Sequence, residues 1–193
     1  MRSLRISLSS AARSDCRVPA KQRLKLSSAS VRVARSADVP ALAVLAAELE
    51  QQTLFVRYQI CASTLHQEFC SLAQSTPVHE TLLLAFSDDN QQIPIGMSRV
   101  VHSGMFGHIG GYLKLIAVCR NAQGKGIGSL LLSASERLVL AHSRDLFLLA
   151  SDFNEAAHTF YLRHGYSHVG SLPDFVRPGI TEFIFRKRLG PKT

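Results

Sequence analysis

The chain has 193 residues, 46% hydrophobic and 19% charged, which suits one globular domain with a real hydrophobic core. This composition excludes a disordered protein, and no apolar run approaches the roughly 20 residues that a membrane span needs. The formal charge of +8 is concentrated in residues 1–30, where seven basic residues face one acid, leaving only +2 for the other 163. A basic nucleic-acid-binding surface on the folded part is therefore not expected.

Residues 1–30 differ in composition from the rest of the chain, being rich in Arg and Ser and without a sustained hydrophobic period. This composition fits a disordered extension, an upstream start that is not used, or an organellar transit peptide. The first two interpretations are favoured, so we expect poor order there, a domain over residues 31–190 and a cytoplasmic protein. The four cysteines show no CxxC spacing, so we expect neither structural disulfides nor a metal site.

The domain is expected to open with a short alternating strand at 31–34. Ser36 to Asp38 then offer helix-capping side chains, and Pro40 suits a first helical turn. Strong helix formers predict a helix over 41–51, and a second helical stretch is predicted over 62–73.

The next segments predict extended structure. Residues 81–86 and 93–103 form two apolar strands that flank a turn cluster at 87–90, the pattern of an antiparallel hairpin. Residues 112–118 are apolar on both faces except for Lys114, which indicates a central strand.

The C-terminal half continues the alternation of strands and helices. The predicted elements are a helix over 126–143, a strand over 145–151, a helix over 155–164, and strands over 166–170 and 182–188. This order predicts a single α/β domain in which helices cover the faces of a mixed sheet.

The segment 120–129 carries the clearest chemical signal, because it is rich in glycine and lies between a predicted strand and a predicted helix. The first four N–H groups of a helix have no internal partners, and the helix dipole adds positive charge at the same end. Glycines let the backbone approach a phosphate closely, and Lys125 and Arg120 can add charge. A phosphate-bearing ligand is therefore expected at this loop.

Two common phosphate-binding loops do not fit this segment. A P-loop needs GxxxxGK[ST], which the sequence lacks. A dinucleotide fold needs GxGxxG, but Gly124, Gly126 and Gly128 alternate, and a hairpin rather than a βαβ unit precedes them.

The pattern that remains is Gln-x-x-Gly-x-Gly, seen as Gln123 to Gly128 after the strand Leu113 to Val118. A second motif follows at the expected distance, Asn154 to Tyr166, with an Asn, a Phe-Tyr pair and a Gly-aromatic end. Together they resemble the two acetyl-coenzyme A motifs of the GNAT N-acetyltransferase superfamily, over residues 31–188. The resemblance implies a largely antiparallel central sheet flanked by helices, acetyl-coenzyme A as acyl donor, no metal, and a possible homodimer through the C-terminal strands.

The resemblance also implies a role for each matching position. The backbone of Ile116, Ala117 and Val118 would bind the pantetheine arm, as would Asn154, and Tyr161 would protonate the leaving thiolate. The pyrophosphate would be held by Gln123, Gly124, Lys125, Gly126, Ile127, Gly128 and Ser129. Transfer would be direct, without a covalent enzyme intermediate.

The residues themselves leave plainer alternatives open. Gln123 could only order its loop, and Asn154 is a natural N-cap for the helix that follows it. Tyr161 lies two turns further along that helix, where a tyrosine more often packs than reacts. Cys119 is more easily explained as a buried small residue than as an acyl carrier.

The general base stays unassigned, because the strand 112–118 carries no carboxylate. The candidates weighed are Lys114 on that strand, Glu48 and Glu50 on the first helix, and Asp152 after a later strand. The acceptor would be recognised by residues 45–75 and by the loop 171–181, which contains Asp174, Phe175 and Arg177.

Three functions are open on these grounds. The favoured one is N-acetylation of a primary amine, on a small molecule or a protein, with neither nucleic acid nor membrane as partner. The second is a non-catalytic domain that binds or senses acyl-coenzyme A on the same fold. The third, a nucleotide-binding domain, would require stabilisation by NAD or ATP but not by coenzyme A.

Overall fold

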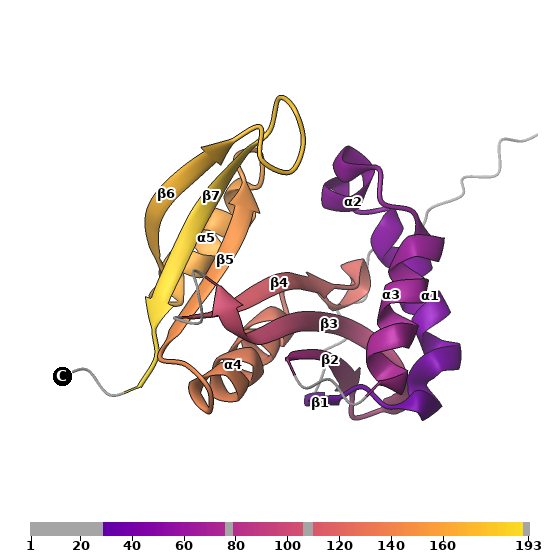
Figure 1. Cartoon of the computed structure of the whole chain (residues 1–193). Coiled ribbons are helices and arrows are strands. Elements are labelled where there is room, and N and C mark those ends of the chain that lie inside the picture. The colour runs from indigo at the N-terminus through magenta and orange to yellow at the C-terminus, as the bar shows by residue number, and fades with distance from the viewer. Residues whose placement is uncertain (1–28, 76–78, 106–109, 191–193) are drawn as a thin grey trace, which may run out of the picture.

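A seven-stranded sheet, in the order β1-β2-β3-β4-β5-β7-β6, organises the computed structural model, which describes residues 29–75, 79–105 and 110–190 (Figure 1). The expectations for residues 1–28 lie outside this range. The strands are β1 (Ala29–Val33), β2 (Glu80–Ser87), β3 (Asn90–Met105), β4 (Gly110–Val118), β5 (Asp145–Ser151), β6 (Ser167–Pro173) and β7 (Thr181–Arg188). All neighbouring strands pair antiparallel except β4 and β5, so the mixed, largely antiparallel sheet is confirmed.

Five α-helices and two short 3-10 helices accompany the sheet in the described part of the chain. They are η1 (Ser36–Asp38), α1 (Val39–Glu50), α2 (Thr53–Tyr58), α3 (Ala62–Gln74), η2 (Arg120–Ala122), α4 (Ile127–Leu140) and α5 (Glu155–Arg163). Helices α1 and α3 pack together on one side of β2 and β3, while α4 packs on the other (Figure 1). Within the described residues, no helix is long and apolar enough to cross a membrane.

The predicted elements are all present, with ends that move by a few residues. Residues Thr81 to Phe86 are fully buried in β2, because helices cover both faces of this strand. The helix after the glycine loop ends at Leu140 rather than near Ser143. Helix α2 was not predicted, because six residues carry too short a pattern to distinguish a helix from a loop.

Helix α1 starts close to the predicted position, but the predicted side-chain cap is not formed. Pro40 lies in the first turn, but no side chain caps the helix. The Asp38 carboxylate instead accepts from the backbone N–H of Arg35 at 2.8 Å and pairs with Arg32 at 2.6 Å. This ion pair lowers the pKa of Asp38 and ties the start of α1 to β1.

Candidate active site

The site originates where β4 and β5 separate. These two parallel strands pair over only three residues, Gly111 to Leu113 with Leu146 to Leu148. Beyond Leu113, β4 continues to Val118 with a partner on the β3 side alone. The edge of β4 that faces β5 is therefore open within the sheet, and unpaired backbone groups there can hydrogen-bond a ligand.

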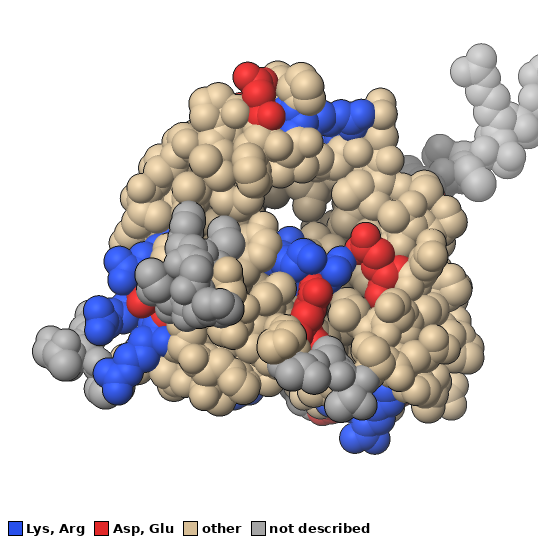
Figure 2. All heavy atoms as spheres, in the orientation of Figure 1, with Lys and Arg blue, Asp and Glu red and all other residues tan. Residues whose placement is uncertain are grey.

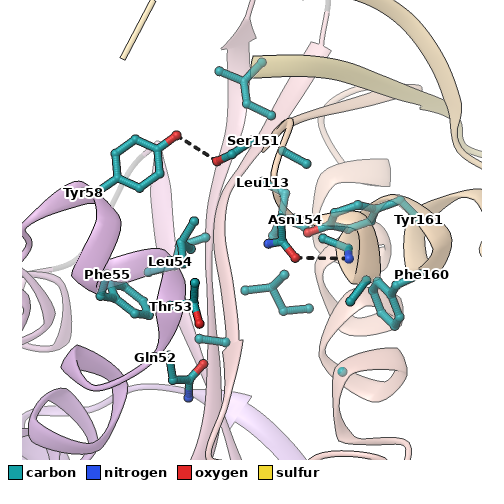
Figure 3. A pocket seen from close by; sticks show the side chains of 18 of the residues that line it. Gln52, Thr53, Leu54, Phe55, Tyr58, Leu113, Ser151, Asn154, Phe160 and Tyr161 are labelled. Carbon is teal, nitrogen blue, oxygen red and sulfur yellow. Dashed lines mark hydrogen bonds between the residues drawn. The ribbon is translucent and has the colours of Figure 1, made fainter. Parts of the chain in front are cut away.

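A pocket of about 990 Å³ fills this separation (Figure 3). Its walls come from β4, from the end of β5, from α2, from the start of α5 and from the loop before β7. The predicted site residues that line it are Ile116, Ala117, Val118, Gln123, Gly128, Asn154 and Tyr161. The structure thus brings both sequence motifs to one cavity.

The glycine loop turns the chain from β4 into α4. Gly124 and Gly126 have φ values of +72° and +84°, a left-handed backbone that side-chain-bearing residues rarely adopt. A Cβ at either position would meet nothing within 4 Å, so these glycines are required by conformation rather than by space. Gly126 is the N-cap of α4, and its carbonyl accepts from the Leu130 N–H at 3.0 Å. The N–H groups ahead of Leu130 are the unpaired donors of this helix end.

Gln123 orders the loop, as its plainer interpretation suggested. Its side-chain amide donates to the carbonyl of Val118 at 3.0 Å, which fastens the loop to the end of β4. The amide of Gln52, just before α2, donates to the same carbonyl, also at 3.0 Å. The end of β4 is thereby held from both sides of the pocket.

Three predicted loop residues do not reach the pocket with their side chains. Ile127 is only 3% exposed and packs in the core. The Ser129 hydroxyl hydrogen-bonds His164 Nε2 at 2.9 Å, while His164 Nδ1 binds the Phe160 carbonyl at 2.7 Å. Lys125 is half-exposed and pairs with no described acid. Ile127 and Ser129 can therefore contact a ligand only through their backbone N–H groups. Lys125 can also use its side chain.

Asn154 is the N-cap of α5. Its side-chain oxygen accepts from the Ala157 N–H at 3.3 Å, and the side chain also lies at the pocket (Figure 3). The capping interpretation is confirmed, and it leaves the side-chain amide N–H groups available to a ligand.

Tyr161 projects from α5 into the aromatic wall of the pocket (Figure 3). The residue is 6% exposed, and its ring contacts Phe160, Tyr166 and Phe185 with centroid separations of 5.3, 5.6 and 5.9 Å. Burial, with a smaller effect from Tyr112, raises the pKa of its phenol above the ordinary value. Tyr161 therefore packs and also keeps a protonated hydroxyl at the cavity.

Three polar residues of the pocket were not singled out from the sequence, although the first of them, Tyr58, lies within the range 45–75 that was expected to recognise the acceptor. Tyr58 on α2 donates a hydrogen bond to Glu182 on β7 and lies 2.8 Å from the Ser151 hydroxyl on β5. Glu182 is 3% exposed and Ser151 is 2% exposed. The only signal for Glu182 was an acid at the start of a predicted strand, which is typical of a solvated strand end.

Of the four residues weighed as bases, only Lys114 lines the pocket, and three of them have partners in the fold. Lys114 lies 3.5 Å from Glu80, and Glu48 accepts from the Arg120 backbone N–H at 2.9 Å. Asp152 is exposed and accepts from the Thr181 N–H at 3.3 Å. Glu50 does not line the pocket.

Cys119 is buried, as expected for a small apolar residue. It is 3% exposed, and burial together with nearby Glu48 raises the pKa of its thiol to about 12. A thiol that stays protonated at neutral pH is a poor nucleophile, which argues against an acyl-carrier role.

Comparison with known sequences and structures decides the family. The sequence profile described as "Acetyltransferase (GNAT) domain" matches residues 79–168, which span the hairpin, the glycine loop and the second motif. The chain carries a GNAT acetyltransferase domain. It is therefore an acyltransferase by family. No curated protein matches the chain significantly by sequence.

Solved structures share this GNAT fold at low sequence identity. A GNAT-family acetyltransferase from Streptococcus pneumoniae is 20% identical, with a TM-score of 0.64 over 84% of this chain and 100% of that one. An acetyltransferase from Thermus thermophilus is 17% identical, with a TM-score of 0.65 over 86% and 100%. An aminoglycoside 6'-N-acetyltransferase complexed with coenzyme A is 16% identical, with a TM-score of 0.59 over 78% and 93%.

Proposed function

We propose that this GNAT domain transfers the acetyl group of acetyl-coenzyme A directly to a primary amine. The observation that supports this most is the continuity of one pocket, which runs from Gln123 and Gly128 along the open edge of β4 to Tyr161 and Glu182. Such a pocket can take an extended ligand, with its anionic end at the helix terminus and its reactive end among the hydroxyls. The aminoglycoside enzyme solved with coenzyme A adds support for this donor.

The donor half of the pocket fits the chemistry of acetyl-coenzyme A. The unpaired N–H groups at the start of α4 suit a pyrophosphate. The open edge of β4 at Ile116 to Val118 and the Asn154 amide suit the peptide-like groups of a pantetheine arm. When bound, the donor supplies an activated thioester carbonyl.

The transfer also requires that the amine lose a proton and that the leaving thiolate gain one. An alkylamine has a pKa near 10.4, so it must lose a proton before it can attack. The Tyr161 hydroxyl, held protonated by burial, donates to the thiolate that leaves. Backbone N–H groups on the open edge of β4 would serve the carbonyl oxygen as it gains charge, because those of Cys119 and Arg120 already donate to Ile95 and Glu48.

Turnover with a panel of amines tests this function. The protein, acetyl-coenzyme A and amines such as tyramine, spermidine and kanamycin are incubated together, and free thiol and acetylated product are both measured. Release of thiol in step with product is expected for at least one amine. Binding of acetyl-coenzyme A without release for any amine would favour a sensing domain instead.

A matched pair of variants separates cofactor binding from backbone strain. Gly126 and Gly104 both have positive φ, at +84° and +118°, with open space where a Cβ would lie. Gly126→Ala and Gly104→Ala should each cost about 1 kcal/mol of stability. Only Gly126→Ala should weaken acetyl-coenzyme A binding, measured by calorimetry, because only Gly126 belongs to the loop.

A further inference from the structure

Glu182 is a carboxylate that the fold buries at the pocket with no ion-pair partner among the described residues. It lies on β7 opposite Ser151 of β5 and is 3% exposed. The ion pairs among the described residues involve Asp38, Glu68, Glu80, Glu136 and Asp145, and none involves Glu182. A buried carboxylate is costly to keep unless hydrogen bonds or a positive charge offset its desolvation.

Among the described residues, one side-chain hydrogen bond reaches the Glu182 carboxylate, and it comes from the neutral hydroxyl of Tyr58. Tyr58 donates its single hydroxyl proton to Glu182, so the Ser151 hydroxyl, 2.8 Å away, must donate to the Tyr58 oxygen (Figure 3). Burial and Glu182 raise the pKa of Tyr58 to about 12, which keeps Tyr58 a donor at neutral pH. A carboxylate has about four acceptor positions, so Glu182 can accept further protons from a ligand in the pocket.

Aromatic side chains surround Glu182, and a contact between α2 and the loop before β7 covers this end of the pocket. The Tyr58 and Phe153 rings lie 6.3 Å apart, and Tyr112 lines the same pocket close enough for Glu182 to raise its pKa. Arg177, in the loop before β7, donates to the Arg57 carbonyl at 2.8 Å and to the Gln59 side chain. This contact bridges α2 and that loop, and Figure 2 shows the surface hollowed beneath the bridge.

We propose that Glu182 binds the ammonium group of the acceptor and takes its proton, and that the acceptor is a monocationic amine on an apolar body. This inference rests on the proposed function, since it assigns the acceptor end of the same pocket. A single buried carboxylate within aromatic walls suits one ammonium carried by an alkyl or aryl chain. Arg57, which lies 4.5 Å over the Phe153 ring, and Arg177 place positive charge at the roof, which disfavours a polycation.

The proton and bond changes balance as follows. The ammonium transfers one proton to the Glu182 carboxylate and becomes a neutral amine. Its nitrogen attacks the thioester carbonyl carbon, so that the C–N bond forms and the C–S bond breaks. The thiolate takes a proton from Tyr161, and the second proton that the nitrogen loses restores the Tyr161 phenol. Glu182 releases the first proton to solvent when the products leave, which restores its carboxylate.

Kinetics of Glu182→Gln test the assignment against a matched carboxylate. Glu136 is also a part-buried acid that accepts from a tyrosine, Tyr166 at 3.1 Å, but it lies outside the pocket. With tyramine as acceptor, Glu182→Gln should lower kcat/KM by about 100-fold or more and leave the Kd of acetyl-coenzyme A unchanged. Glu136→Gln should keep kcat/KM within about threefold of the wild-type value. An unchanged kcat/KM in Glu182→Gln would overturn the proposal.

Equilibrium binding tests the cation site without any turnover. In the presence of coenzyme A, wild-type protein should bind tyramine at least about tenfold more tightly than tyrosol, the neutral alcohol of the same shape, and more tightly than spermidine. Glu182→Gln should erase the preference for tyramine over tyrosol. Equal binding of tyramine and tyrosol by wild type overturns the Glu182 site, even if the variant fails to fold.

Turnover and equilibrium binding together separate failure of the Glu182 site from failure of the acetyltransferase function. If no amine is acetylated but tyramine binds through Glu182, the transfer reaction fails and the cation site stands. If spermidine or kanamycin is acetylated while tyramine is neither bound nor acetylated, the N-acetyltransferase stands and the monocationic acceptor is wrong.

Discussion

At the scale of single residues, the surroundings of each hydroxyl decide whether it can act as an acid. Tyr166 is buried, and its hydroxyl donates to Glu136 at 3.1 Å, so this proton is committed to the structure. The Tyr161 hydroxyl has no described hydrogen-bond partner and lies at the pocket. Burial raises the pKa of both phenols, so both stay protonated at neutral pH, but only Tyr161 can give its proton to a ligand.

Replacing Tyr161 by Phe removes that proton donor and preserves the aromatic packing. We expect kcat to fall by about 100-fold, while the Kd of acetyl-coenzyme A and the melting temperature change little. Because the folded pKa is raised above the ordinary value of about 10, wild-type kcat should show no loss from this group below about pH 10.

Tyr166→Phe is the control for this experiment. It removes the same atom from a neighbouring ring and should cost about 1 kcal/mol of stability with kcat unchanged. Equal kcat in wild type and Tyr161→Phe would mean that Tyr161 serves only in packing. That is the plainer alternative that the sequence left open for this residue.

At the scale of elements, the short pairing between β4 and β5 is what opens the pocket, and α4 packs tightly at that point. A Cβ on Gly111 would lie 2.5 Å from Val139 Cγ1 on α4 and 3.1 Å from the His102 carbonyl. Gly111 is therefore a glycine because the helix and the backbone of β3 leave no room for a side chain.

Gly111→Ala should destabilise the fold by about 1–3 kcal/mol, measured by urea unfolding, because α4 or β4 must shift. Gly170→Ala in β6 is the control, since its Cβ would meet Ile184 at an ordinary 3.5 Å. Combining Gly111→Ala with Val139→Ala should recover part of the loss, a coupling of about 0.5–3 kcal/mol. Simple additivity of the two changes would show that the clash with Val139 is not the cause.

The order of the elements could be predicted from the sequence because each long element carries its own local pattern. The glycine loop and the start of α5 were also visible, since turn and cap chemistry is local. The cluster of Tyr58, Ser151 and Glu182 could not be, because it joins α2, β5 and β7 across the sheet. Its members lie far apart along the chain, and none belongs to a motif.

At the scale of the whole molecule, the pocket lies between two hydrophobic clusters. One contains α1, α3 and β2, and the other contains β5, β7 and α5. Helix α4 belongs to both, with Leu131 in the first cluster and Leu132 and Val139 in the second. The halves are thus joined by α4, by the three residue pairs of β4 and β5, and by the contacts of α2 with Ser151, Glu182 and Arg177, and a ligand in the pocket would add a further connection.

Coenzyme A should therefore stabilise the entire domain rather than one loop. At a concentration 100 times its Kd, ligand binding contributes about 2.7 kcal/mol, which for a chain of this size corresponds to a rise in Tm of about 5–10 °C.

NAD and ATP at the same concentration should raise Tm far less, because they lack the pantetheine arm that would reach along β4. Greater stabilisation by NAD or ATP than by coenzyme A would contradict the assignment of the pocket. Gly126→Ala should lose much of the coenzyme A shift and Gly104→Ala should keep it, because the proposed phosphate site is the turn at the start of α4, the helix that contributes to both clusters.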